Sequence, residues 1–298
     1  MPDLWTLFGQ MWAYNFMVRG VAVTLVTGVV CAVISCWLVM IGWSLMGDAL
    51  SHAVLPGVVI AYLVDIPFSV GAMVAALVVV GLIFTVRHTS RVKPDVSMGV
   101  VFTMFFAFGL VLVSKNPSNI DLNHVLFGDL LGITNTDMYQ VLVLAPLALV
   151  ILLLRRRDLT AYAFDPVHLE AIGISTRGVA ATLLVCLVLT VVTAMQAVGA
   201  ILIVTLLITP GATALLLTER FTRMLVVAPV LSVFTSLTGI YLSYWFDTAS
   251  GATVVAVGGV VFFLVWLVSP RGLRGFLFAH RKGEPSEAVA EVRGSTAR

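Results

Sequence analysis

Long apolar runs, separated by short polar or basic stretches, occupy most of this chain. A helix of about 20 apolar residues is long enough to cross the hydrocarbon core of a membrane. Each run of roughly that length is therefore predicted to be a membrane-spanning helix: 21–41, 49–64, 68–86, 97–113, 137–154, 179–194, 198–217, 224–245 and 251–268. The pattern predicts an all-α, polytopic membrane helix bundle with eight to nine transmembrane segments.

Two of these runs are candidates for broken helices, and either of them could be interrupted instead of a plain span. The run 49–64 is short and contains Pro56, and the run 198–217 contains a Thr-Pro-Gly sequence at 209–211. Proline lacks the backbone donor that a helix needs, and interrupted membrane helices often carry transporter binding sites. Eight complete spans and one broken segment would also satisfy most of the pattern.

Basic residues predict the orientation of the bundle. They cluster at 87–93, 155–157, 220–223 and 271–282, and successive clusters are separated by even numbers of predicted spans. Lys and Arg accumulate on the cytoplasmic side of membrane proteins, so all four clusters are expected there. Nine spans then place the N-terminus outside, and Arg19 departs from the pattern.

The predicted organisation has three parts. Residues 1–20 are rich in aromatic residues and are expected to form an interfacial N-terminal segment. Residues 21–268 form the transmembrane domain. Residues 269–298 form a cytoplasmic tail, and its polar end is expected to be partly disordered.

Composition supports a membrane protein and excludes several enzyme classes. Of 298 residues, 60% are hydrophobic and 11% are charged, whereas about a quarter of the residues of a soluble domain are charged. The net charge of +2 suggests no nucleic-acid partner. No phosphate-binding G-x-x-x-x-G-K-[ST] motif and no hydrolase motif is present. We therefore expect a subunit without an ATPase site of its own.

An acid and an imidazole interrupt the second apolar run. Asp48 and His52 are four residues apart, so they share one face of a helix. A charged Asp at the centre of a membrane helix is costly, so the pair should face a protein interior or a watery cavity. Carboxylate oxygen and imidazole nitrogen are ligands of divalent transition metals. Alternatively, Asp48 is a helix N-cap and His52 a packing histidine.

A second polar segment follows the fifth predicted span. Asp165 is an N-cap candidate, Pro166 suits the first helical position, and Gly173 would end the helix after about two turns. This short helix has a small apolar face, and Glu170 projects elsewhere. Such a helix in a cytoplasmic loop suggests docking onto a partner, although it could instead lie on the membrane surface.

Two further features bear on transport. Thr205, Thr209 and Thr213 recur every four residues and so face one way, either lining a path or hydrogen-bonding a neighbouring helix. The outward loop 114–136, with His124 and Asp129, is too short to hold a binding domain. Capture of a substrate would therefore need a separate protein.

The segment 46–57, M-G-D-A-L-S-H-A-V-L-P-G, resembles the most recognisable segment of the metal-ion ABC permeases. Segments 164–174, F-D-P-x-H-x-x-x-I-G-I, and 198–214 also resemble that family, as does 241–255, and the likeness extends over most of the chain. One departure is Ala-Ser-Gly at 249–251, where family members more often have Pro-Thr-Gly.

The resemblance implies a function for the whole chain. It would be the membrane-spanning permease subunit of an ATP-driven importer of a divalent transition metal, working by alternating access in the bacterial inner membrane. Manganese is favoured and zinc or iron is possible. The metal would be transported, with no tight structural metal site and no permanently bound cofactor. Expected partners are a cytoplasmic ATP-binding subunit, an extracytoplasmic metal-binding receptor and a second permease copy or paralogue.

The resemblance also assigns residues to roles. Asp48 and His52 would form a metal pathway or gate, and the ATPase docking helix would include four residues: Asp165, Pro166, Glu170 and Gly173. Two other functions stay open from the residues alone. One is an ATP-independent secondary carrier or channel for divalent cations, and the other is a membrane scaffold that transports nothing.

Overall fold

The computed structural model describes residues 12, 14–91, 93–115 and 133–270, and within them the regular structure is helical. The helices are α2 (Asn15–Ile41), α3 (Met46–Ala53), α4 (Leu55–Val64), α5 (Phe68–Thr89), α6 (Pro94–Lys115), α8 (Asn135–Leu154), α9 (Arg156–Phe164), α10 (Pro166–Ala171), α11 (Thr176–Val198), α12 (Ala200–Leu217), α13 (Phe221–Phe246) and α14 (Ser250–Val268). Nine helical stretches in this part of the chain are long and apolar enough to cross a membrane, if α3 and α4 are taken as one. The predicted all-α membrane bundle is confirmed.

The observed helix ends extend several predictions. α2 begins at Asn15, inside the segment 1–20 that was expected to lie at the interface. The rest of that segment lies almost entirely outside the described residues, as do most of the tail 269–298 and the outer-loop residues His124 and Asp129. The extra turns arise because a membrane helix continues until a cap or turn satisfies its last backbone groups.

The two expected helix breaks had different outcomes. The second span divides into α3 and α4 at Val54, just before Pro56, as predicted. The backbone at Val54 stays close to helical (φ −77°, ψ −12°), so the helix is interrupted only locally. The break expected at 209–211 is wrong, because α12 continues through Pro210. Neighbouring helices commonly stabilise a proline inside a membrane helix.

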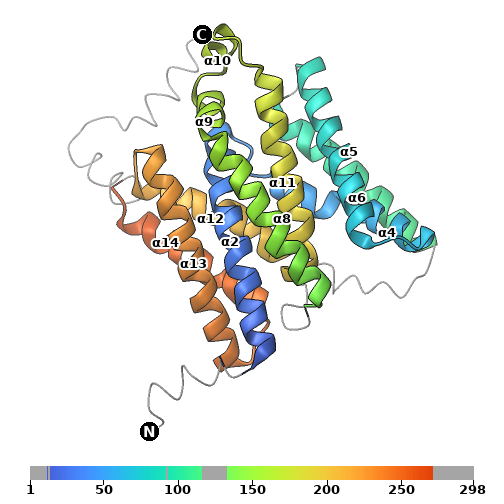
Figure 1. Ribbon diagram of the computed structural model, residues 1–298, viewed down its shortest axis with the longest axis vertical. Coiled ribbons are helices and arrows are strands. Elements are labelled where there is room, and N and C mark those ends of the chain that lie inside the picture. Colours follow the sequence, from blue (N-terminus) through green and yellow to red (C-terminus); the bar gives the residue numbers. More distant parts are fainter. Residues whose placement is uncertain (1–11, 13, 92, 116–132, 271–298) are drawn as a thin grey trace.

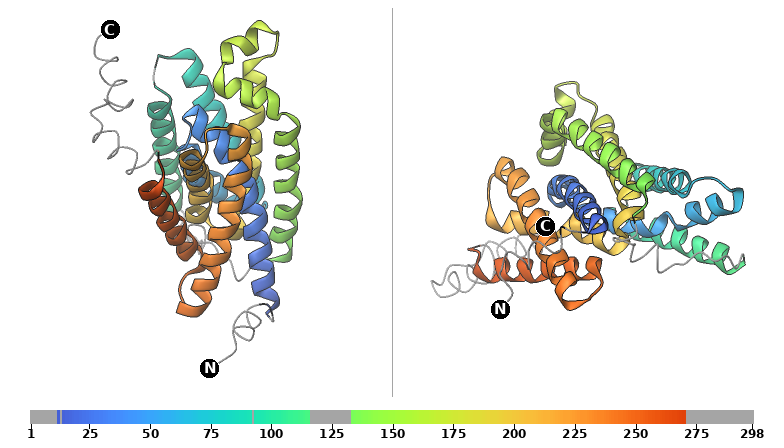
Figure 2. Two further views of the ribbon diagram at one scale, coloured as in Figure 1. Left: turned by 90° about the vertical axis from the view of Figure 1, so that its left-hand side faces the viewer. Right: turned by 60° about the horizontal axis from the view of Figure 1, so that its bottom comes forward.

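The helices around and beyond α2 form three groups (Figures 1 and 2). α12, α13 and α14 pack together on one side of α2, α8 and α11 lie on another, and α4, α5 and α6 form a third group beyond α11. α3 contacts members of all three groups, namely α12, α11, α5 and α6. The segment with Asp48 and His52 therefore lies where the three groups meet.

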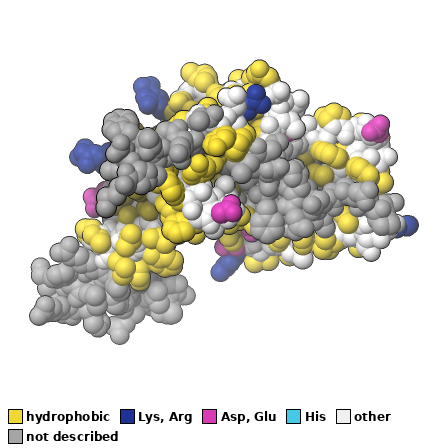
Figure 3. Space-filling view, turned by 90° about the horizontal axis from the view of Figure 1, so that it is seen from below, with side chains coloured by type: hydrophobic (Ala, Val, Ile, Leu, Met, Phe, Trp, Pro, Cys, Tyr) yellow, Lys and Arg dark blue, Asp and Glu magenta, His cyan; other side chains and the backbone are white. Residues whose placement is uncertain are grey.

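The two ends of the bundle differ in charge. One end, where α9 packs, carries Arg87, the arginines at 155–157 and Arg220. The ring of Phe164 at the end of α9 contacts Phe221, next to Arg220, and Arg87 lies over the ring of Trp43 at the same end. At the other end, the Arg19 Nη1 group donates a hydrogen bond to Asn135 Oδ1 (2.8 Å). Figure 3, seen from below, shows charged side chains as isolated patches among hydrophobic ones. The clustering of basic residues at one end agrees with the predicted orientation.

Small residues let α4 and α5 approach closely. A Cβ atom at Gly57 would overlap the carbonyl oxygen of Gly71 and lie 2.5 Å from the Cβ atom of Ala75. A Cβ atom at Gly71 would in turn lie 2.6 Å from that of Ala61. The four positions form two small-x-x-x-small pairs. Such pairs hold membrane helices together by van der Waals packing, since lipid supplies no hydrophobic force between helices.

We expect Gly57→Ala to lower the unfolding free energy by about 1–3 kcal/mol, the usual cost of overpacking. The added methyl group would push α4 away from α5. The measurement is the thermal unfolding of the purified protein in detergent. Gly81→Ala is the matched control on α5, because a Cβ atom there has no neighbour within 4 Å. Equal stability of the two variants would contradict the close contact.

Candidate functional site

A tight turn joins α2 to the short helix that carries Asp48. Gly42 adopts a left-handed conformation (φ 79°), and Trp43 N–H donates to the Leu38 carbonyl (2.7 Å). This is the hydrogen-bonding pattern of a Schellman motif, which ends a helix and redirects the chain. Met46 N–H then donates to the Trp43 carbonyl (3.0 Å), so α3 begins immediately after the turn.

Asp48 and His52 lie side by side on α3. His52 Nε2 is 3.5 Å from Asp48 Oδ1, and the side chains are 25% and 42% exposed, respectively. The N-cap position of α3 belongs to Leu45, with no side-chain cap. The alternative that Asp48 is an N-cap is therefore wrong, since Asp48 sits within the first turn of the helix.

Aromatic residues of α6 flank the histidine. The His52 ring centroid lies 5.9 Å from that of Phe102 and 5.7 Å from that of Phe106. Offset and edge-on contacts at this distance are favourable and fix the ring plane. The imidazole is thus held between a tilted and an edge-on phenyl ring, while Nε2 lies 3.5 Å from the carboxylate of Asp48.

The rest of α3 is enclosed by the bundle. Met46, Gly47, Ala49, Leu50, Ser51 and Ala53 are buried. A Cβ atom at Gly47 would lie 2.5 Å from Cδ1 and 3.3 Å from Cβ of Leu207 on α12, so α3 and α12 meet closely at this glycine. Asp48 and His52 are therefore the only side chains of α3 that are partly exposed.

Depth along the segment follows from the helix order. α3 starts at the basic end of the bundle, next to Arg87, and α4 ends at Asp65 on the other side. Asp48 lies within the first turn of this crossing, and His52 lies a turn further in. Both residues belong to the first half of the segment 46–64.

One chain supplies few metal ligands at this site. In the described ranges, no group of three or more His, Cys, Asp or Glu residues is close enough to hold a metal ion together. Asp48 and His52 thus provide two donors, one oxygen and one nitrogen. A divalent transition metal normally takes at least four ligands, so further donors would have to come from water or from another chain.

The second candidate segment has the predicted local structure. Asp165 Oδ1 accepts a hydrogen bond from His168 N–H (2.9 Å), and Pro166 is the first residue of α10. Gly173 is left-handed (φ 83°), and Ile174 N–H donates to the Leu169 carbonyl (3.1 Å) in a second Schellman motif. The predicted cap, first turn and helix end are confirmed.

α10 and its C-cap residue expose two apolar side chains. Leu169 is buried, whereas Val167 and Ile172 are 77% and 56% exposed. Glu170 Oε1 accepts a hydrogen bond from Thr176 Oγ1 at the start of α11 (2.6 Å). α10 therefore presents an apolar face at the basic end of the bundle and is joined to the transmembrane helices behind it.

The family model described as the ABC 3 transport family matches residues 13–269. The chain belongs to this family. It is similar to the manganese transport system membrane protein MntB of Synechocystis, with 46% identity over 87% of this chain and 84% of that protein. It is also 44% identical to the chelated iron transport system membrane protein YfeD of Yersinia pestis, over 90% of both chains.

A solved structure supports the arrangement of this ABC 3 permease. The structure of PsaBC from Streptococcus pneumoniae in complex with Fab aligns with a TM-score of 0.79 and 32% identity, covering 89% of this chain and 96% of that chain. The protein is thus a multi-pass permease of the bacterial inner membrane. As a transport subunit, it belongs with the ATP-binding subunits that define ABC transporters.

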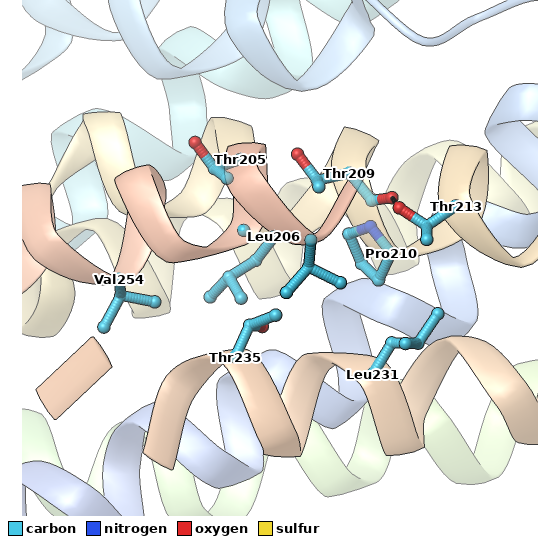
Figure 4. Close-up of a pocket in the computed structure, with 10 residues that line it drawn as sticks. Thr205, Leu206, Thr209, Pro210, Thr213, Leu231, Thr235 and Val254 are labelled. Carbon is cyan, nitrogen blue, oxygen red and sulfur yellow. Dashed lines mark hydrogen bonds between the residues drawn. The ribbon is translucent and has the colours of Figure 1, made fainter. Parts of the chain in front are cut away.

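The threonine stripe of the permease faces away from Asp48 and His52. Methyl groups of Thr205 and Thr209 lie 3.6 and 3.7 Å from the position of a Cβ atom at Gly258 on α14. Leu207, which contacts α3, is two residues from each threonine and therefore about 160–200° round the helix. Figure 4 shows this stripe beside α13, where Thr235 and Leu231 line the same small pocket.

Two hydroxyls of the stripe, those of Thr205 and Thr213, bond within α12. Thr205 Oγ1 donates to the Ile201 carbonyl (3.2 Å), and Thr213 Oγ1 donates to the Thr209 carbonyl (2.7 Å). This back-bonding satisfies a hydroxyl in a membrane without a partner helix. The stripe therefore serves the packing of α12 against α14.

Sequence reasoning missed a cluster at the inner end of α3. Trp43, Arg87 and Tyr162 come from three separate elements and contact one another there. The position of Trp43 beside a helix-ending glycine was the only local signal, because the other two residues are distant in the sequence.

We expect the Gly47 and Leu207 contact to appear in a double-mutant cycle of unfolding free energies. Gly47→Ala should destabilise the permease because a Cβ atom there would overlap Cδ1 of the buried Leu207. Leu207→Ala should destabilise it through a cavity, and the double variant should lose about 1 kcal/mol less than the sum. Additive losses, measured by thermal or chemical unfolding, would contradict direct packing at Gly47.

Proposed function

We propose that this permease is the membrane-spanning subunit of an ATP-driven importer of a divalent transition metal. The observation that carries the proposal is the Asp48 and His52 pair, 3.5 Å apart on the one accessible face of a buried helix. Two polar residues in membrane helices are expensive, and such residues usually belong to a substrate pathway. The names of the relatives, which transport manganese or chelated iron, support a metal as the substrate.

The separation of the two ligand atoms suits a single ion. Metal bonds to histidine nitrogen and carboxylate oxygen are about 2.0–2.2 Å long. If one ion bonded to both of these atoms, which are 3.5 Å apart, the angle between its two bonds would be roughly 105–120°, close to the tetrahedral value. The distance between the two atoms therefore allows Asp48 and His52 to bind one cation together.

The donor set favours transient binding of a dication. One carboxylate and one imidazole suit Mn(II), Fe(II) or Zn(II) and select weakly among them. A second permease copy or a paralogue, placed so that its equivalent pair faces this one, would complete the coordination. Incomplete binding helps transport, because an ion must leave as well as enter. The metal is cargo, and manganese is favoured by the likeness to MntB.

The apolar face of α10 is proposed as the docking surface for the cytoplasmic ATP-binding subunit. Val167 and Ile172 are exposed there, at the end of the bundle with most of the basic residues. ATP binding and hydrolysis would move α10 and thereby alternate the access of the Asp48 and His52 site. An extracytoplasmic receptor would deliver the metal, and this chain would carry no ATPase site.

The deciding experiment is reconstitution in liposomes with the candidate ATP-binding subunit and receptor. Accumulation of labelled Mn, Zn and Fe would be measured in competition, with and without ATP. We expect accumulation that depends on ATP and on the receptor. Equal accumulation without ATP would instead support a secondary carrier or channel, and no accumulation of any of the three metals would support a scaffold.

Asp48→Ala and His52→Ala are each expected to abolish metal uptake, since one donor alone cannot hold the ion. Both variants should still insert in the membrane and bind the ATP-binding subunit. Uptake by metal-starved cells is the measurement. Asp48→Asn removes the charge at the site, and Asp65→Asn is its control. Asp65 is exposed at the end of α4 in a left-handed conformation that Asn also tolerates, so uptake by this control should be normal. Normal uptake by the position-48 and position-52 variants would rule out their role in the pathway.

Glu170→Lys is expected to uncouple the ATP-binding subunit by reversing a charge on the docking helix. The measurements are co-purification of the subunit and its ATPase rate in the complex. Thr176→Val is the control, because it removes the hydrogen bond to Glu170 and keeps the carboxylate. An equally severe Thr176→Val variant would mean that Glu170 acts through α11 and not at the docking surface.

A further inference from the structure

Three side chains meet where the docking segment approaches α3. The Arg87 guanidinium carbon lies 4.7 Å from the ring centroid of Trp43, and the Tyr162 ring stands edge-on to the same indole at 6.3 Å. The Arg87 guanidinium is also close enough to Tyr162 to interact with its phenol group. The three residues come from α5, from α9 and from the turn between α2 and α3. Displacement of any one of these elements therefore changes the contacts of the other two.

Trp43 is held by its ring. The side chain is 3% exposed, and its Nε1 group has no hydrogen-bond partner among the described residues. The ring face binds the guanidinium, and a cation over an indole in a desolvated position is among the stronger contacts of this type. The important property of residue 43 is therefore an aromatic ring, while the indole N–H is dispensable.

Tyr162 connects this cluster to the docking surface. Burial raises the pKa of its phenol, and the nearby Arg87 charge only partly opposes the shift. The hydroxyl therefore stays protonated at neutral pH and can accept from Arg87. Tyr162 lies on α9, three residues before Asp165, which caps α10.

Both sides of the cluster are stiff. On one side, Leu159 of α9 and Leu169 of α10 are fully buried. On the other, the Schellman turn holds Trp43, whose carbonyl accepts the first hydrogen bond that leads into α3. Asp48 follows Trp43 by five residues. A displacement of α9 can therefore reach Asp48 without being absorbed in a loop.

We infer that Trp43, Arg87 and Tyr162 form the mechanical link through which the ATP-binding subunit moves α3 and its Asp48 and His52 pair. The three are positioning residues, since none of them contacts the ion. The inference rests on the proposed ATP-driven function. It commits to the route through this cluster. Two other side-chain contacts of α9, between Thr160 and Trp37 and between Phe164 and Phe221, lead to α2 and α13, which carry neither Asp48 nor His52. The packing of α9 on α11, which also contacts α3, is the alternative route that the test below separates.

The first test measures metal accumulated per ATP hydrolysed in the reconstituted importer. We expect Trp43→Ala and Arg87→Gln to keep the receptor-stimulated ATPase rate and to lower the ratio by roughly 5- to 150-fold, the usual range of coupling between two sites. Trp43→Phe should restore most of the ratio because it keeps a ring. Thr160→Val is the control on α9, since it removes the hydrogen bond from Trp37 Nε1 and leaves the cluster intact.

The second test does not depend on metal transport. A cysteine at position 48 would report the exposure of α3 through its labelling by a water-soluble maleimide, as the three native cysteines are buried. In the complex, adding ATP should change the labelling rate, and Trp43→Ala should abolish this change while ATP is still hydrolysed.

The two tests separate the inference from the proposed function. Failure of the unsubstituted importer to accumulate metal with ATP would overturn the proposed function. The link would be overturned if the ATP-dependent change in labelling at position 48 survived Trp43→Ala. It would also be overturned if ATP caused no such change in the protein that keeps Trp43, Arg87 and Tyr162. Loss of coupling in Trp43→Phe equal to that in Trp43→Ala would also contradict it, because the ring contacts would then not be what matters.

Discussion

The packing of Gly47 against Leu207 determines which face of α3 is available for chemistry. Because residue 47 has no side chain, α3 lies directly on α12, and its apolar residues are enclosed. The one remaining face carries Asp48 and His52. An acid and an imidazole cannot face hydrocarbon without a large cost. The exposed face of α3 must therefore meet water, an ion or a second protein. The proposed metal pathway depends on this constraint.

The same kind of close packing connects α3 and α4 to different parts of the bundle. Gly47 joins α3 to α12, whereas Gly57 joins α4 to Gly71 of α5. The chain changes course slightly between these contacts, at Val54. Lipid supplies no hydrophobic force between helices, so such close contacts largely decide which helices move together. A movement of α12 relative to α5 would therefore be concentrated at α3 and α4, the short segment that holds the site.

The docking helix and the site lie at opposite ends of a short, well-determined route. α10 has an Asp165 cap at one end and a left-handed Gly173 at the other, while Gly42 ends α2 in the same way just before Trp43. Arg87 and Tyr162 occupy the space between them. Conformational coupling needs elements with discrete arrangements, and short helices joined by rigid turns meet this requirement better than flexible loops do.

Local sequence determined the membrane spans, the cap and end of α10, and the shared face of Asp48 and His52, because apolar length, capping and the i, i+4 spacing each depend on neighbouring residues only. It did not reveal that α12 continues through Pro210, that the threonine stripe faces α14, or that Asp48 lies inside the first turn of α3. Nor did it bring Arg87 and Tyr162 to Trp43. These features depend on which helices pack together, and only the tertiary structure decides that, since similar apolar helices can be arranged in many ways until small residues select the close contacts.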